Sequence, residues 1–181
     1  MYKKGSIKLD IFNEQIIKKT KSPLELLLLM LLYVAGLTVG MLLIFFGLTF
    51  APTFIFTFII LAGVVFYFTI KIGTNLNFEF EYSVTNNLFD VDKIIAKSRR
   101  KRLVSMDLMT IDDVGVYSSE KFKGRSFDLT VNAVGNPNQD GIIYIVTRHP
   151  TKGKTLVIFQ PNEKIVDALK KSLPYNLKNN I

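Results

Sequence analysis

Residues 26–70 read LLLLMLLYVAGLTVGMLLIFFGLTFAPTFIFTFIILAGVVFYFTI. These forty-five residues contain no Asp, Glu, Lys, Arg or His. As one helix they would be about 67 Å long, twice the thickness of the hydrocarbon core of a bilayer. The segment Thr49–Thr53, which contains Pro52, divides them into Leu26–Leu48 and Phe54–Ile70, each close to the length of one span. The sequence therefore predicts a transmembrane helical hairpin that is retained, because a signal peptide has one short apolar region and not two long ones.

Small residues occur in both predicted helices and predict close packing between them. They are Gly36, Gly40 and Gly47 in the first helix and Ala62 and Gly63 in the second. Small residues let membrane helices approach closely, either within one chain or between two copies of a chain. We expect packing within the hairpin, with a homo-oligomer as the alternative. The absence of ionisable side chains in both spans disfavours a transport site or a proton relay.

Lysines surround the hairpin unevenly and predict its orientation. Six precede the first span and one follows the second, while the connecting turn carries no charge; they are Lys3, Lys4, Lys8, Lys18, Lys19, Lys21 and Lys71. Because positive residues are retained on the cytoplasmic side, we expect a multi-pass protein of the cell membrane with both termini in the cytoplasm.

The chain is predicted to have four parts: a basic amphipathic segment (1–22), the hairpin (23–73), a soluble domain (74–175) and a short tail (176–181). In the first part, Leu9, Phe12 and Ile16 recur at helical spacing and predict a short helix at the membrane interface; the alternative is a basic tail that only sets the topology. The order Ser22-Pro23-Leu24-Glu25 predicts a capping box where the first span begins.

After Gly73 the sequence pattern changes to that of a β-rich domain. Phe78, Phe80, Tyr82 and Val84 alternate with polar residues, which predicts a half-buried strand, and Asn86-Asn87 then predicts a hairpin turn. Six further strands are predicted at 88–96, 103–108, 111–117, 127–134, 142–147 and 155–159. A helix over 162–173 follows, with an apolar stripe formed by Ile165, Ala168, Leu169 and Leu173.

Three runs in this domain carry a resemblance to a known family. The runs YSVTNNLFDVDKII (82–95), RRKRL (99–103) and IDDV (111–114) resemble those of bacterial pleckstrin-homology-like (PH-like) membrane proteins. Such proteins have a short basic N-terminus, two transmembrane helices and a cytoplasmic PH-like domain. The resemblance implies an α+β membrane protein whose seven-stranded antiparallel β-barrel or sandwich is capped by a C-terminal α-helix, and it supplies no catalytic residues.

Composition excludes several classes of chemistry. The chain has no Cys and a single His, His149, which excludes disulfides and thiolate catalysis and disfavours metal or triad sites based on His. Glu79, Glu81, Asp90 and Asp92 are predicted to lie on one sheet face, where a solvated surface is favoured over a metal or general-acid site. We therefore predict no enzymatic activity, no metal and no cofactor.

The net charge of +8 indicates an anionic partner. If the strands form an up-and-down meander, the turns nearest the membrane hold eleven bases: Lys97, Arg99, Arg100, Lys101, Arg102, Lys121, Lys123, Arg125, Arg148, Lys152 and Lys154. The distal turns hold Asp112, Asp113 and Asp140 and no base. This asymmetry predicts binding to anionic lipid head groups. The alternative is that the run 97–102 only solvates a hairpin and follows the positive-inside bias.

The sequence thus predicts a membrane-anchored, non-catalytic PH-like module that binds anionic lipid head groups or a protein partner. The alternative function is a structural subunit or assembly factor of a larger membrane protein complex. Nucleic acid is disfavoured as a partner because the hairpin restricts the domain to the membrane.

Overall fold

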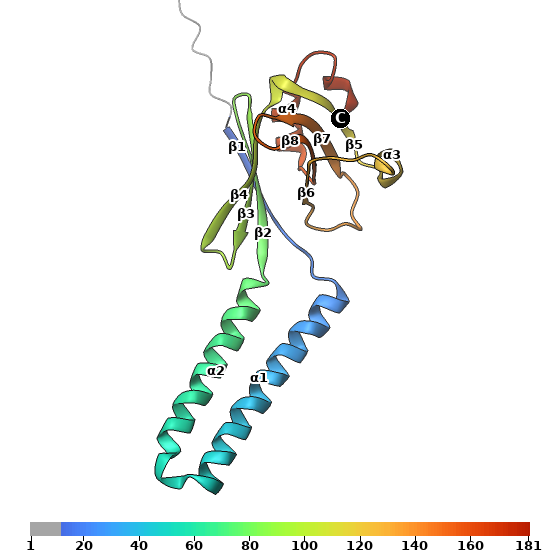
Figure 1. Cartoon of the computed structure of the whole chain (residues 1–181). Helices are drawn as coiled ribbons and strands as arrows, with labels where there is room; N and C mark the ends of the chain where they lie inside the picture. Colours follow the sequence, from blue (N-terminus) through green and yellow to red (C-terminus); the bar gives the residue numbers. More distant parts are fainter. Residues whose placement is uncertain (1–11) are drawn as a thin grey trace, which may run out of the picture. The chain divides into compact units, whose positions relative to one another are not determined.

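The computed structural model describes residues 12–181 and divides them into two compact units (Figure 1). One unit is the helical hairpin, residues 20–78; the other combines residues 12–19 with residues 79–181. The hairpin is therefore inserted between the first and second strands of the soluble unit. This division corrects the predicted boundary at residue 22, because the described part of the N-terminal segment belongs to the soluble unit.

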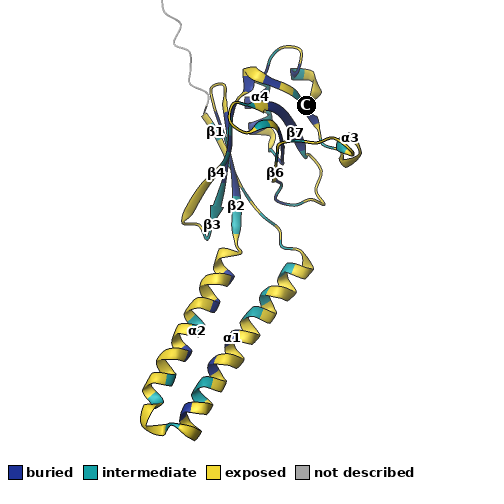
Figure 2. Cartoon of the chain, viewed as in Figure 1, coloured by how far each residue is buried: buried dark blue, intermediate teal, exposed yellow. Residues whose placement is uncertain are grey.

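The helical unit contains α1 (Pro23–Phe50), the short helix η1 (Pro52–Phe54) and α2 (Ile55–Asn75). The predicted capping box is confirmed: the Glu25 backbone N–H donates to Ser22 Oγ (3.2 Å) and the Ser22 N–H donates to Glu25 Oε2 (3.1 Å). Within the segments Pro23–Phe50 and Pro52–Asn75, windows of 18 residues reach mean hydropathies of 2.6 and 2.3. By length and composition, both are able to cross a membrane. Figure 2 shows that most of their surface is exposed, as the lipid-facing surface of such helices would be.

The glycine face of α1 packs against large side chains of α2. A Cβ atom at Gly36 would lie 2.3 Å from Thr69 Oγ1, and one at Gly40 would lie 2.8 Å from the Phe66 ring. Gly47 is equally close to the Phe58 ring. The predicted role of the three glycines and of the buried Ala62 is consistent with this packing, but Gly63 is exposed, with nothing within 4 Å of its Cβ position. The prediction for Gly63 was wrong because it lies on the face of α2 that points away from α1.

The first sheet has the order β1-β2-β3-β4. It is formed by β1 (Phe12–Lys18), β2 (Phe78–Thr85), β3 (Leu88–Ile95) and β4 (Arg99–Asp107). The predicted interfacial helix is wrong for its described part, because residues 12–18 pair antiparallel with β2, from Phe12 opposite Thr85 to Lys18 opposite Glu79; Leu9 lies outside the described residues. Alternation of inward and outward side chains along β1 matches a strand, and pairing satisfies the backbone groups of β2 that would otherwise form an open edge.

The second sheet has the order β5-β7-β8-β6. It is formed by β5 (Ile111–Val116), β6 (Leu129–Ala133), β7 (Ile143–His149) and β8 (Gly153–Phe159); η2 (Leu108–Thr110) precedes β5 and α3 (Ser119–Phe122) follows it. Strand β6 runs parallel to β8 and therefore also to β5. The β5–β6 connection, which contains α3, must therefore return to the end of the sheet where β5 begins. The described residues thus form eight strands in two four-stranded sheets, and not a seven-stranded antiparallel meander or a closed barrel.

The C-terminal helix α4 (Glu163–Ser172) confirms the predicted apolar stripe. The four predicted residues Ile165, Ala168, Leu169 and Leu173 are all at most 3% exposed. Asn162 caps the helix by accepting the Ile165 N–H (3.0 Å), and its own N–H donates to Gln15 Oε1 of β1 (2.7 Å). Near the C-terminus, Leu177 is buried and precedes η3 (Lys178–Asn180), so residues 176–181 belong to the soluble unit and are not a separate tail.

Candidate functional site

The predicted basic turn 97–102 is split between a tight turn and a strand. Ala96 and Lys97 have positive φ angles (50° and 56°), and the Ser98 N–H donates to the Ile95 carbonyl oxygen (3.1 Å). Strand β4 begins immediately afterwards at Arg99. The basic residues of the run therefore alternate between the two faces of the sheet, because successive side chains of a strand point in opposite directions.

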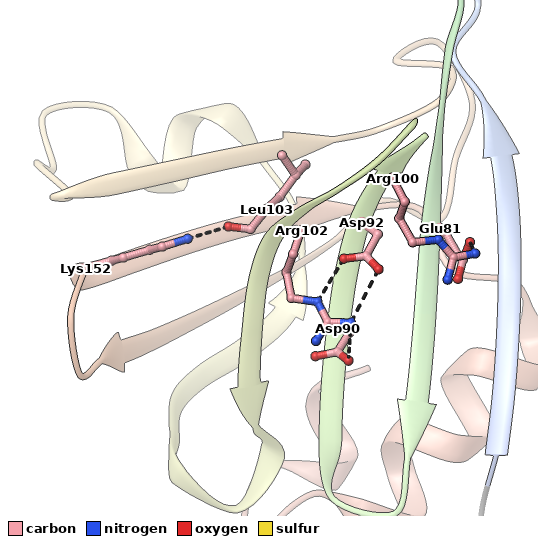
Figure 3. Close-up of polar contacts among 7 residues, drawn as sticks. All are labelled: Glu81, Asp90, Asp92, Arg100, Arg102, Leu103 and Lys152. Carbon is pink, nitrogen blue, oxygen red and sulfur yellow. Dashed lines mark hydrogen bonds and ion pairs between the residues drawn. The ribbon is translucent and has the colours of Figure 1, made fainter. Parts of the chain in front are cut away.

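A β-bulge determines which face each base occupies. Val91 lies opposite Val104, whereas Asp92 lies opposite Arg102, so Leu103 is an extra residue in β4. Without it, Arg102 would share the core-facing side of Val104; with it, Arg102 points to the outer face. The Leu103 carbonyl oxygen accepts a hydrogen bond from Lys152 Nζ (2.6 Å), which joins the β7–β8 turn to the bulge (Figure 3).

On the outer face, Arg100 and Arg102 neutralise buried carboxylates (Figure 3). Arg102 lies 3.0 Å from Asp92 Oδ1 and 3.1 Å from Asp90 Oδ2, and Arg100 lies 2.6 Å from Glu81 Oε2. The side chains of Asp92 and Glu81 are only 5% exposed. Burial raises the pKa of Glu81, and the charge of Arg100 opposes that rise. The predicted solvated face is therefore wrong at Glu81 and Asp92, and the two arginines have a structural task.

On the inner face of the same hairpin, lysines gather. Lys93 and Lys101 lie directly opposite each other in the β3–β4 register. Burial and the positive charges of Lys19 and Lys101 lower the pKa of Lys93. Lys19 and Lys93 are not among the site residues predicted from the sequence. The available indication was that Lys93 follows Phe89 and Val91 at the inward-facing positions of β3.

The second basic segment, 121–125, packs on the second sheet. Lys121 Nζ donates to the Tyr144 hydroxyl group and lies 3.4 Å from Asp113 Oδ2, while the Tyr144 hydroxyl donates to the same carboxylate (2.8 Å). The Phe122 ring lies 4.7 Å from that of Tyr144, and the Arg125 guanidinium lies over Phe122. These contacts anchor α3. They also bring Lys121 and Asp113 together, although the meander had placed them at opposite ends.

The third basic segment, 148–154, forms the β7–β8 turn. Its Lys154 N–H donates to Asp128 Oδ2 (2.7 Å), and the Lys154 ammonium lies over the Phe127 ring. In the register, Ile111 lies opposite Thr147, so this turn and the start of β5 share one end of the sheet. The predicted separation of basic proximal turns from acidic distal turns is therefore wrong for the second sheet. Its strands have the order β5-β7-β8-β6 and do not continue the up-and-down meander on which that prediction depended.

In the first sheet, the β3–β4 turn lies at the end where β1 finishes and β2 begins. The register places Lys18 opposite Glu79 and Ile95 opposite Arg99 at that end, where the chain also connects to α1 and α2. The basic β3–β4 hairpin and both connections to the helices are thus neighbours within the sheet, while the Asn86-Asn87 turn lies at the other end.

A family model described as Bacterial PH-like domain (DUF6106) matches residues 9–179. The matched range includes the helical hairpin, both sheets and α4. No curated protein and no solved structure matches the chain.

Proposed function

Because the chain belongs to the bacterial PH-like domain family (DUF6106), we propose that it is a non-catalytic PH-like module, anchored in the cell membrane by its helical hairpin. The partner that the charge distribution supports best is the anionic lipid head groups of the cytoplasmic leaflet. A protein partner in a larger membrane complex is the competing proposal, and the experiment below distinguishes the two.

The length of the chain connections supports this proposal most. Strand β2 begins three residues after α2 ends at Asn75, so Phe78 lies within about 11 Å of the helix end. Lys97, Arg99 and Lys101 lie at the same end of the first sheet as Glu79. Each such base near an anionic leaflet contributes about 1 kcal/mol, and the attraction decays over about 8 Å at physiological ionic strength.

Fewer bases are available for the lipid contact than the eleven that the sequence predicts. Within the described residues, Arg100, Arg102 and Lys121 form ion pairs with carboxylates. Their charges are partly compensated inside the protein. The lipid contact is therefore assigned mainly to the β3–β4 hairpin, through Lys97, Arg99 and Lys101.

The proposal requires both termini to be in the cytoplasm, which is the orientation that the lysines around the hairpin favour. A fluorescent reporter that folds only in the cytoplasm, fused after Ile181, is expected to be bright. An alkaline phosphatase fusion at the same position is expected to be inactive. An active phosphatase fusion would place the soluble unit outside and contradict the lipid contact with the inner leaflet.

The lipid contact itself is testable in the full chain, because the absence of native Cys permits single-site labelling. A fluorophore on Ser98→Cys is expected to approach dye-labelled head groups in nanodiscs as phosphatidylglycerol replaces phosphatidylcholine. The same fluorophore on Asn87→Cys, in the opposite turn, is the positional control. High salt is expected to abolish the response, because exposed charges are then screened within about 3 Å.

A pair of charge variants completes this test. Lys97→Gln with Arg99→Gln removes two charges at the turn and should weaken the phosphatidylglycerol-dependent state by about 2 kcal/mol. Lys170→Gln with Lys171→Gln removes two charges from α4, next to Ser172, whose hydroxyl contacts Asn86 at the opposite end. If both pairs respond to phosphatidylglycerol like the parent chain, the lipid proposal is wrong. Discrete proteins that co-purify in mild detergent would then favour a subunit of a membrane complex.

A further inference from the structure

A cavity lies at the open end of the helical hairpin, where the chain connects to the soluble unit. Its volume is about 130 Å³. It is lined by Lys21, Glu25, Leu28, Leu29, Leu76 and Phe78, all of which belong to the helical unit. An apolar cavity of about 150 Å³ in a protein is large enough to bind benzene. The cavity of the hairpin therefore has room for several carbon atoms.

The cavity arises because the packing of α1 on α2 loosens toward this end of the hairpin. Nearer the turn, three glycines of α1 admit larger side chains of α2. One turn before the cavity the roles are reversed, because Gly73 of α2 lies against the hydroxyl end of Tyr33. A tyrosine ring between the two backbones keeps them farther apart than the contacts of the α1 glycines do. Figure 1 accordingly shows a wider separation of the helices at this end than at the turn.

The depth of the cavity coincides with the edge of the hydrocarbon core of a bilayer. That core is about 30 Å thick, so a helix crosses it in about 20 residues. Counted from the turn, a span of this length leads from Leu48 to Leu28 in α1, and in α2 it leads to the helix end at Asn75. The leucines of the cavity therefore lie at the depth of the glycerol backbone and the first methylene groups of a phospholipid. Lys21 precedes α1 and lies on the water side of these leucines.

Two charged residues stand at the polar end of the cavity. The Glu25 carboxylate is engaged in the capping box, where it accepts the Ser22 N–H (3.1 Å). The Lys21 side chain forms no ion pair with any residue in the described range 12–181. Its ammonium group offers three hydrogen-bond donors, which suit the oxygens of a phosphate. Because one base and one acid line the cavity, it has no net charge and does not require a lipid of net negative charge.

We propose that this cavity binds one phospholipid, with the upper part of an acyl chain between the leucines and the phosphate on Lys21. A phospholipid presents methylene groups and a phosphate at the two depths where the cavity presents leucines and a base. The site goes beyond the proposed function, because it uses no residue of the β3–β4 hairpin. Only its assignment to the cytoplasmic leaflet rests on the orientation proposed above.

The energetics of the site differ from those of burial from water. Lipid tails are as apolar as leucine, so transfer of an acyl chain from the bilayer gains little hydrophobic free energy. Binding is instead driven by the dispersion contacts that an unfilled cavity lacks and by the charge-assisted hydrogen bond of Lys21 to the phosphate. A bound lipid touches both helices at their open end. We therefore expect one saturable site per chain whose occupation stabilises the hairpin.

Binding can be measured with the full chain in a mild detergent by native mass spectrometry. The probes are phosphatidylcholine and the diacylglycerol with the same acyl chains, which lacks the phosphate. We expect one phosphatidylcholine per chain and weaker binding of diacylglycerol. Lys21→Gln should weaken phosphatidylcholine binding about fivefold or more, the loss expected for one hydrogen bond to a charged group, and leave diacylglycerol binding unchanged. Lys71→Gln is the matched control, because it removes a lysine near the same end of the hairpin but outside the cavity.

A second pair of variants tests the cavity by its volume. Leu29→Trp fills the space without a change of charge and should abolish the saturable site for both probes. Leu27→Trp introduces the same side chain at a position that is 52% exposed and outside the cavity, and it should retain the site. Phosphatidylcholine should raise the melting temperature of Leu27→Trp but not of Leu29→Trp. If Leu29→Trp destabilises the hairpin without lipid, the comparison of Lys21→Gln with Lys71→Gln decides.

The outcomes distinguish this site from the proposed function. Equal binding by Leu29→Trp and Leu27→Trp, or equal effects of Lys21→Gln and Lys71→Gln, would overturn the site. Phosphatidylcholine carries no net charge, so attraction to the bases of the β3–β4 hairpin does not contribute to its binding. A phosphatidylcholine site without any response of the Ser98 fluorophore to phosphatidylglycerol would support the site and contradict the proposed function. The reverse result would overturn the site and leave the proposed function intact.

Discussion

Leu169→Asp is expected to unfold the soluble unit. Leu169 is 0% exposed and lies in the middle of the stripe by which α4 packs on the core. Removal of a buried leucine side chain alone costs about 2–5 kcal/mol, and burial of an unpaired carboxylate adds to that cost. A domain of ordinary stability has only about 5–15 kcal/mol to lose.

The measurement uses the full chain in detergent, because β1 lies before the hairpin and a fragment that begins after α2 would lack an edge strand. Hydrogen exchange should show rapid exchange in β2–β8 of the variant while α1 and α2 stay protected. Lys164→Asp is the matched control: it introduces the same group on the exposed side of α4, in the first turn, where the helix dipole favours an acid. Equal protection in both variants would show that α4 is not part of the core.

The parts of the fold that sequence alone predicted correctly are those with an unambiguous local pattern. The charge-free stretch predicted both helices, the Ser22–Glu25 capping box predicted the start of α1, and the stripe around Leu169 predicted the buried face of α4. Burial of these segments follows from composition and spacing within a few turns. Their structure therefore depends little on which distant segment they contact.

Strand β1 shows where local pattern is insufficient. Phe12 and Ile16 are spaced like one face of a helix, but Asn13, Gln15 and Ile17 also alternate as in a strand. Residues 12–18 form a strand because they pair with β2, which lies about sixty residues later in the chain, beyond the helical hairpin. A seven-residue segment does not contain that information, because the hydrogen bonds that stabilise it are supplied by a distant partner.

The prediction of the candidate site was incomplete for a related reason. The basic run 97–102 was found, but its division between two faces depends on one extra residue, Leu103, in the pairing of β3 with β4. A shift of one residue exchanges the faces of all side chains that follow. The sequence shows how many charges the run contains but not which partner each one has. The pairing of β3 with β4 determines that Arg100 and Arg102 bind Glu81 and Asp92, and that Lys93 lies opposite Lys101.

Gly36→Leu is expected to force the two helices of the hairpin apart. The Cβ atom would lie 2.3 Å from Thr69 Oγ1 and 2.7 Å from Thr69 Cγ2, far inside contact distance. Thr69 is 9% exposed, and its hydroxyl donates to the Val65 carbonyl oxygen (2.8 Å), so its side chain has little room to move away. Overpacking of this kind costs about 1–3 kcal/mol or more, and here the whole leucine side chain must be accommodated.

Gly63→Leu provides the matched control, because nothing lies within 4 Å of a Cβ atom at Gly63. Both substitutions raise helix propensity by nearly 1 kcal/mol, so the difference between them isolates the packing of α1 on α2. Spin labels on Leu31→Cys and Ile70→Cys, both exposed positions, report the separation of the helices in nanodiscs. We expect the distance to increase by several ångströms, about the size of the added side chain, in Gly36→Leu and to stay unchanged in Gly63→Leu. An unchanged distance in both would mean that the glycine face of α1 does not hold the hairpin together, and association between chains would then be the remaining role for these glycines.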